Sequence, residues 1–135
     1  MTSDVPSVMD TYYPQGAVVV LDHDPYDAKS SRPALIISDD KHPDRYNETV
    51  EDPAYTAAFL TTGFYTDNAW ARKITYTDLD EGKALSRQNS HVMLWALRPI
   101  YESEIDKRVA QVTEDFLYAL GDDYKTFFDP SETHL

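Results

Sequence analysis

The stretch that decides the fold is residues 16–38, which reads GAVVVLDHDPYDAKSSRPALIIS. Two short apolar runs, at 18–21 and 34–37, flank a polar and acidic loop. Short apolar runs bounded by turn-forming residues are typical of buried β-strands. Arg32 and Pro33 lie directly before the second run, and the proline biases the arginine toward extended backbone. The guanidinium is thus expected at the mouth of a strand, where its five donors suit a phosphate or a carboxylate.

The rest of the chain continues this pattern of short strands. Further strands are predicted at 55–62, 73–77, 91–97 and 109–112, with a helical turn starting at Ser103. Thr113 is predicted to cap a C-terminal helix, which Gly121 weakens or ends early. The helix has an apolar stripe made of Phe116, Leu117, Leu120, Tyr124 and Phe127. Five or six strands and one helix predict a mostly β fold, a small and mostly antiparallel barrel.

Length and composition indicate one domain. The 135 residues suffice for a single core, and the expected organisation is an N-terminal arm at 1–14, a barrel domain at 15–128 and a tail at 129–135. The chain has no cysteine, which excludes disulfides and thiolate metal sites. It has neither an apolar run of about 20 residues nor a secretion signal, so we expect a cytoplasmic protein with no membrane partner.

The charge balance is strongly acidic. The sequence has 24 acidic residues, 17 of them aspartate, against 12 basic ones, for a net charge of -12. An apolar content of 41% argues against a disordered chain. Binding of a basic partner or of cations stays open, but the acids are scattered along the chain, which favours a halophilic protein of a salt-rich cytoplasm. Such a charge counts against non-specific nucleic-acid binding, so any such role depends on a local pocket.

Several segments together resemble the MazF/PemK family of toxin endoribonucleases. In chain order, these segments are Gly16, VVLD at 19–22, RPALIIS at 32–38, FLTT at 59–62, SHVMLWALRPI at 90–100, EIDKRV at 104–109 and TED at 113–115. The resemblance covers about residues 16–120. It implies an SH3-like barrel that forms a homodimer, pairs with a cognate antitoxin, and cleaves single-stranded RNA without metal or other cofactor.

Carried over by position, the resemblance makes Arg32 the catalytic arginine and Thr61 the catalytic hydroxyl. The chain departs from the family pattern at two places. An acid or amide followed by glutamine is usual where Trp95 and Ala96 stand, and an aspartate where Ala17 stands. The first departure removes polar groups expected near the RNA.

The chemistry of metal-free RNA cleavage fits these residue types. The 2′-hydroxyl of RNA attacks the neighbouring phosphorus, and the protein orients it and stabilises the growing negative charge. Arg32 suits that charge, although it also suits a structural pair with an aspartate. Thr61 can bind the phosphate or the attacking oxygen, Thr62 is the alternative one register step away, and the general base stays open.

Other candidates carry weaker signals. Arg98 is predicted either to bind RNA or to pair with an acid, and Tyr26 is predicted to stack on an unpaired base. His23 is expected in a solvated loop, and His91 as a hydrogen-bonded structural histidine. Two functions are therefore predicted. The first is an endoribonuclease toxin. The second is a catalytically inactive barrel module that binds a protein or RNA, and Trp95 and Ala96 favour it.

Overall fold

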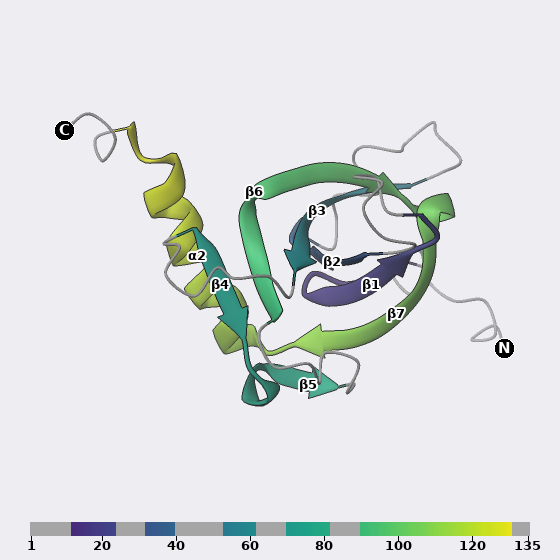
Figure 1. The fold of residues 1–135 in the computed structure, drawn as a ribbon, viewed down its shortest axis with the longest axis horizontal. Helices are drawn as coiled ribbons and strands as arrows, with labels where there is room; N and C mark the ends of the chain where they lie inside the picture. Colours follow the sequence, from purple (N-terminus) through teal and green to yellow (C-terminus); the bar gives the residue numbers. More distant parts are fainter. Residues whose placement is uncertain (1–11, 24–31, 40–52, 62–69, 82–89, 131–135) are drawn as a thin grey trace, which may run out of the picture.

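One antiparallel sheet and one long helix make up the described part of the chain. The computed structural model describes residues 12–23, 32–39, 53–61, 70–81 and 90–130. Seven strands follow the order β4-β6-β3-β2-β1-β7-β5 and curl into a half-barrel, with α2 (Glu114–Phe128) outside it beside β4 and β6 (Figure 1). The strands are β1 (Ala17–Leu21), β2 (Pro33–Ile36), β3 (Ala54–Thr61), β4 (Ala71–Ile74), β5 (Leu79–Glu81), β6 (Ser90–Tyr101) and β7 (Ile105–Val112). The predicted mostly β fold with a C-terminal helix is confirmed.

The central strands are buried on both faces, and alternate side chains divide between two apolar clusters. On β3, Ala58 and Leu60 belong to the cluster that contains Phe116 of α2. Ala57 and Phe59 belong to the cluster on the opposite face. We call these the helix face and the far face of the sheet. Successive side chains of a strand point to opposite faces. Once the cluster of one residue is known, the faces of its neighbours along the strand are therefore known too.

Gly16 joins three strands at the start of β1. Its N–H donates to the Ile36 carbonyl (2.7 Å), and its carbonyl accepts from the Val112 N–H (2.9 Å). Its φ of 91° is favourable only for glycine, and a Cβ there would lie 2.7 Å from Gln111 Nε2. The glycine that opens the defining sequence stretch is therefore required by backbone geometry.

Strand β6 is longer than predicted, since the predicted strand ends at Leu97. It continues through Pro99, which pairs with Thr56 of β3. Strand β4 pairs only with positions 90–93, so at Pro99 the second edge of β6 has no neighbour among the described strands. A missing N–H there costs no ladder hydrogen bond, and proline is tolerated.

The segments around β4 and β7 also differ from the prediction. A 3₁₀ turn, η3 (Tyr76–Asp78), replaces the end of the predicted fourth strand, and β5 follows it unpredicted. The turn closes locally because Thr75 N–H donates to the Asp78 carboxylate (2.8 Å). A second turn, η4 (Glu102–Glu104), is capped from Tyr101 rather than Ser103, and β7 starts four residues before the predicted 109.

Helix α2 starts as predicted and runs further. Thr113 Oγ1 accepts from the Phe116 N–H (3.1 Å), so the predicted cap is confirmed. Gly121 does not end the helix: its position is exposed and the helix continues to Phe128. Beyond the glycine, Tyr124 donates its hydroxyl to the Leu94 carbonyl of β6 (3.1 Å), which ties the second half of the helix to the sheet. Tertiary packing here overrides the low helix propensity of glycine.

A bidentate ion pair also ties α2 to the edge strand β4. Arg72 donates Nε and Nη2 to the two carboxylate oxygens of Asp123, the second bond being 3.0 Å long. The hydrogen bond with Asp123 raises the pKa of Arg72 above its ordinary value. Paired donors and acceptors of this geometry are the strongest kind of surface ion pair.

We expect Asp123→Asn to lower the free energy of unfolding by about 1 kcal/mol, because one charge-assisted bond loses its charge. Urea unfolding followed by circular dichroism measures the change. Asp122→Asn is the matched control, since the Asp122 carboxylate is exposed and its ion pair with Lys125 is long, at 4.0 Å. Equal losses in the two variants would contradict a specific role for the Arg72 pair.

Candidate functional site

Arg32 is a buried arginine whose direction the structure fixes. Only 8% of its surface is exposed, although it lies immediately before β2. Its Nη1 donates to the carbonyl of Leu60 at 3.2 Å. That carbonyl belongs to the peptide bond between Leu60 and Thr61. The guanidinium therefore lies against the backbone that carries the predicted catalytic hydroxyl.

The register of the sheet lines up four polar side chains across neighbouring strands. Ala34 pairs with Phe59, and two further steps of the same register set Arg32 opposite Thr61. Thr61 pairs directly with His91 of β6, and His91 pairs directly with Lys73 of β4. We call these residues the polar row: Arg32, Thr61, His91 and Lys73. Directly paired residues project from the same face of a sheet.

The polar row lies on the far face, away from α2. The residues adjacent to it in sequence, Leu60, Val92 and Ile74, all belong to the cluster that packs on α2. Alternation then turns Thr61 and His91 to the other face. With about 4.8 Å between neighbouring strands, the row spans roughly 14 Å from end to end.

The charges of the polar row differ from those of the chain as a whole. Arg32 and Lys73 provide a cation at each end, and none of the four positions is acidic, while the net charge of the chain is -12. His91 is 1% exposed, whereas Lys73 is exposed. The row therefore combines a buried guanidinium, a hydroxyl, a buried imidazole and an exposed ammonium group. Such a set can bind a phosphodiester and stabilise negative charge on it.

Arg98 lies on the same face of the sheet but at a distance from the polar row. It pairs with Ala57, four residues from Thr61 along β3, which corresponds to about 13 Å. It lines a small polar pocket together with Asp22, His23, Ser103 and Glu104. The acids of this pocket keep both predicted interpretations of Arg98 open.

The remaining predicted residues divide into described and undescribed ones. Tyr26 and Thr62 lie outside the described residues. His23 is exposed, as expected for a solvated loop position. Trp95 is 43% exposed while Ala96 is buried. Both lie in an irregular part of β6, where β6 advances by five residues while its partner β3 advances by two. The family departure at these two positions therefore puts an aromatic ring on the surface.

Sequence reasoning misses two members of the polar row. It predicts only that Lys73 lies in a strand and that His91 is structural. Nothing in the linear spacing of positions 32, 61, 73 and 91 marks them as a group. The usable signal is strand alternation, because His91 and Lys73 each precede an apolar residue that turns inward. Only the pairing of β4, β6 and β3 shows that they share a row.

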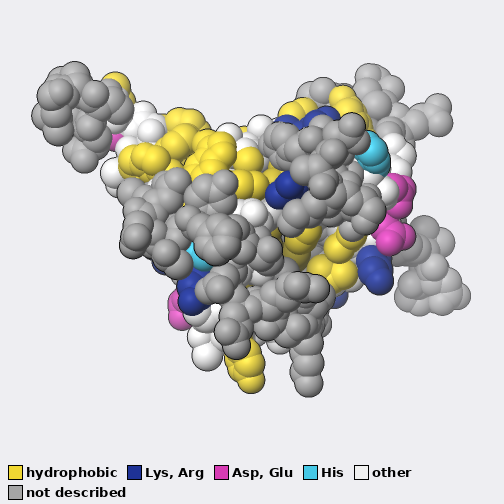
Figure 2. Space-filling model, viewed as in Figure 1, with side chains coloured by type: hydrophobic (Ala, Val, Ile, Leu, Met, Phe, Trp, Pro, Cys, Tyr) yellow, Lys and Arg dark blue, Asp and Glu magenta, His cyan; other side chains and the backbone are white. Residues whose placement is uncertain are grey.

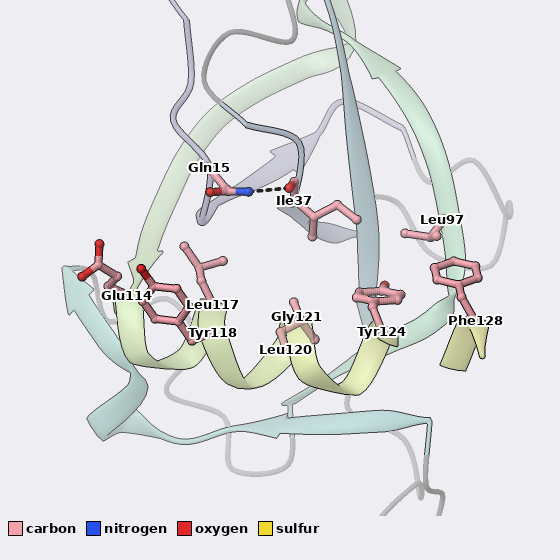
Figure 3. Close-up of a pocket in the computed structure, with 10 residues that line it drawn as sticks. All are labelled: Gln15, Ile37, Leu97, Glu114, Leu117, Tyr118, Leu120, Gly121, Tyr124 and Phe128. Atoms are coloured by element: carbon pink, nitrogen blue, oxygen red, sulfur yellow. Dashed lines mark hydrogen bonds between the residues drawn. The ribbon is translucent and has the colours of Figure 1, made fainter. Parts of the chain in front are cut away.

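A second hollow, of apolar character, lies between α2 and the sheet. Its lining includes Leu117, Leu120 and Tyr124 of the helix and Ile37 and Leu97 of the sheet side (Figure 3). Gln15 closes one end by donating to the Ile37 carbonyl at 2.8 Å. On the face viewed in Figure 2, hydrophobic side chains gather over α2 and the neighbouring part of β6. This hollow offers apolar contact rather than phosphate chemistry.

Within the described ranges, no cluster of three or more His, Asp and Glu side chains forms a metal site. None of the described helices is long and apolar enough to span a membrane.

Fold and site together define a class of protein: a small curled antiparallel β-domain with a buried arginine held beside a strand-end hydroxyl. Residues 14–126 match the family of PemK-like, MazF-like toxins of type II toxin-antitoxin systems, and the chain belongs to this family. No curated protein sequence matches the chain significantly.

Solved structures show the same fold. A mycobacterial endoribonuclease in complex with its cognate antitoxin superposes with a TM-score of 0.58 at 16% identity, covering 84% of this chain and 90% of that one. MazE-MazF from Deinococcus radiodurans gives 0.58 at 16% identity, covering 85% and 93%. A mycobacterial endoribonuclease gives 0.57 at 18% identity, covering 84% and 88%. At these identities the likeness establishes the architecture.

The buried position of Arg32 predicts a stability cost for its removal. Arg32→Ala leaves the Leu60 carbonyl without this donor, and we expect the free energy of unfolding to fall by about 1–3 kcal/mol. Arg98→Ala is the matched control, because the Arg98 Nε donates at 3.4 Å to the carbonyl of the adjacent Pro99, a local contact that holds no other strand. Chemical unfolding of both variants measures the difference, and an equal effect would contradict the fixed position of Arg32.

Proposed function

We propose that this protein is a metal-independent endoribonuclease toxin that cleaves single-stranded RNA. The observation that carries the proposal is the contact of the Arg32 guanidinium with the Leu60 carbonyl, which holds a buried cation beside Thr61. Membership of the MazF-like toxin family supports it. Two solved structures with the same fold are endoribonucleases, which agrees with it.

The proposed reaction uses the RNA's own nucleophile. The 2′-oxygen forms a bond to the adjacent phosphorus, the bond from phosphorus to the 5′-oxygen breaks, and the 2′-proton is lost as the 5′-oxygen gains one. Negative charge grows on the two non-bridging oxygens, where the planar guanidinium of Arg32 donates hydrogen bonds. Its Nη1 donates to the Leu60 carbonyl, and that bond fixes the direction of the planar guanidinium. Thr61 contacts the attacking oxygen or the phosphate.

The flanking cations are proposed to bind the phosphates on either side. Lys73 stands at the other end of the polar row, and Arg98 lies about 13 Å away on the same face. RNA would meet these cations at the rim of the far face, because Ala57 and Phe59, which lie between Arg98 and Thr61, are fully buried. A short cationic track of this kind explains how a protein with a net charge of -12 can bind RNA locally.

Partners follow from the family and from the known complexes. We propose a cognate antitoxin as the protein partner, since two of the matching structures are toxin–antitoxin complexes. We also propose a homodimer located in the cytoplasm. In a salt-rich cytoplasm, repulsion between the acidic surface and RNA would be screened within about 3 Å at 1 M salt.

A second candidate is a catalytically inactive binding module. The observation that favours it is Trp95, which is 43% exposed where the family usually has a polar residue. An exposed ring can stack on a base or pack against a protein without taking part in cleavage.

Thr61 separates the two functions. We expect the parent protein to cleave single-stranded RNA in molar potassium chloride, and Thr61→Ala to be slower by about 100-fold or more. Thr61→Ser, which keeps the hydroxyl, should stay within about tenfold of the parent. Cleavage is followed by gel electrophoresis of an end-labelled RNA pool. RNA binding without cleavage by a folded parent protein would favour the module.

The cationic track makes a separate prediction about salt. Replacing Lys73 or Arg98 by alanine should weaken RNA binding and reduce the slope of log K against log salt by about 0.7 for each phosphate that is no longer neutralised. Fluorescence anisotropy with a labelled single strand measures this, with Lys125→Ala on the exposed side of α2 as the control. An unchanged slope for both track variants would exclude these two residues from the interface.

A further inference from the structure

We infer that His91 is a positioning residue that orients the hydroxyl of Thr61. In this inference an imidazole nitrogen accepts the Thr61 O–H, so that Oγ1 directs its lone pairs at the 2′-hydroxyl of the RNA. The inference rests on the proposed function, because it assigns a new residue to the same site.

The first argument is the position of His91 in the sheet. It is the direct antiparallel partner of Thr61, on the side opposite to Arg32. Directly paired side chains have Cβ atoms about 4.5–5.5 Å apart, which puts an imidazole nitrogen within hydrogen-bond reach of a threonine hydroxyl. Thr61 thus lies between a cation on one neighbouring strand and an imidazole on the other.

The second argument is burial. His91 is 1% exposed and is one of three buried polar or charged residues in the described chain, with Arg32 and Ser90. A side chain so enclosed has few rotamers and holds a fixed direction. It is too enclosed to be the group that touches RNA itself, whereas Thr61 is only partly buried. Its action on the reaction must therefore pass through Thr61.

The third argument concerns the hydroxyl. A threonine O–H rotates and can donate to any acceptor nearby, including the phosphate. When its hydrogen is committed to an imidazole nitrogen, the remaining lone pairs can only accept. They then hold the hydrogen of the 2′-hydroxyl and leave the 2′-oxygen lone pairs directed at phosphorus, which is the orientation that attack requires.

The test compares three variants at His91 and Ser90 by cleavage kinetics in molar potassium chloride. His91→Gln keeps a side-chain acceptor, so we expect a kcat within about tenfold of the parent. His91→Val removes the acceptor, so kcat should fall about 10- to 100-fold with KM within about threefold. Ser90→Ala is the matched control: it is also buried, but it pairs with Ile74 on the helix face and should change neither quantity.

A double-mutant cycle decides whether His91 acts through Thr61. If it does, His91→Val added to Thr61→Ala causes no further loss, whereas independent effects would multiply. Thermal unfolding checks that each variant is folded, and His91→Leu, which also lacks an acceptor, replaces His91→Val if that variant does not fold.

The outcomes distinguish the two proposals. A kcat of His91→Gln as low as that of His91→Val, or a multiplicative loss in the double variant, overturns the role of His91 and leaves the nuclease intact. Loss of cleavage in Thr61→Ala with full activity in both His91 variants does the same. Absence of cleavage by the folded parent protein overturns the nuclease and the role of His91 together.

Discussion

The register of β3 against its two neighbours fixes both the core and the candidate site. Ala58 and Leu60 pack on the helix face, and Ala57 and Phe59 pack on the far face. Packing on both faces therefore fixes the orientation of β3. A slip of one residue would exchange the two sets and turn Thr61 toward α2. Each large apolar side chain that moved out of its place would cost about 1.5–3 kcal/mol. The hydroxyl is held in position by the packing of its neighbours.

The same alternation sorts the charges of β4. Arg72 and Lys73 are adjacent, but one turns to the helix face and the other stands in the polar row. Asp123 neutralises Arg72, which ties the helix to the sheet, whereas Lys73 pairs with His91 in the polar row on the far face. A chain with twice as many acids as bases can in this way hold a locally cationic strip. Sheet geometry allows this because cross-strand neighbours come from distant parts of the sequence.

Features that depend on nearby residues were predicted from the sequence. The strands near Gly16 and after Arg32, and the Thr113 cap, each depend on residues within a few positions. The sequence does not show the full length of β7, because residues 106–108 are exposed and charged and so leave no apolar pattern, although Lys107 and Arg108 pair with β1. The sequence does not predict that β6 continues through Pro99, for another reason. A strand tolerates proline only where the proline faces no neighbouring strand, and the sequence does not show which strands are neighbours. Gly121 stays helical because Tyr124 is held by β6.

The sequence by itself determined the small β architecture and the pairing of an arginine with a following proline at a strand entrance, because backbone sterics and apolar periodicity are local. It also determined the acidic surface, which is a matter of composition. Only the tertiary structure decided that Arg32 is buried against the Leu60 carbonyl and that Thr61, His91 and Lys73 share a row with it. Those neighbours come from different strands that are far apart in the chain. Their register is set by packing on both faces of the sheet, which cannot be read from any local stretch of the sequence.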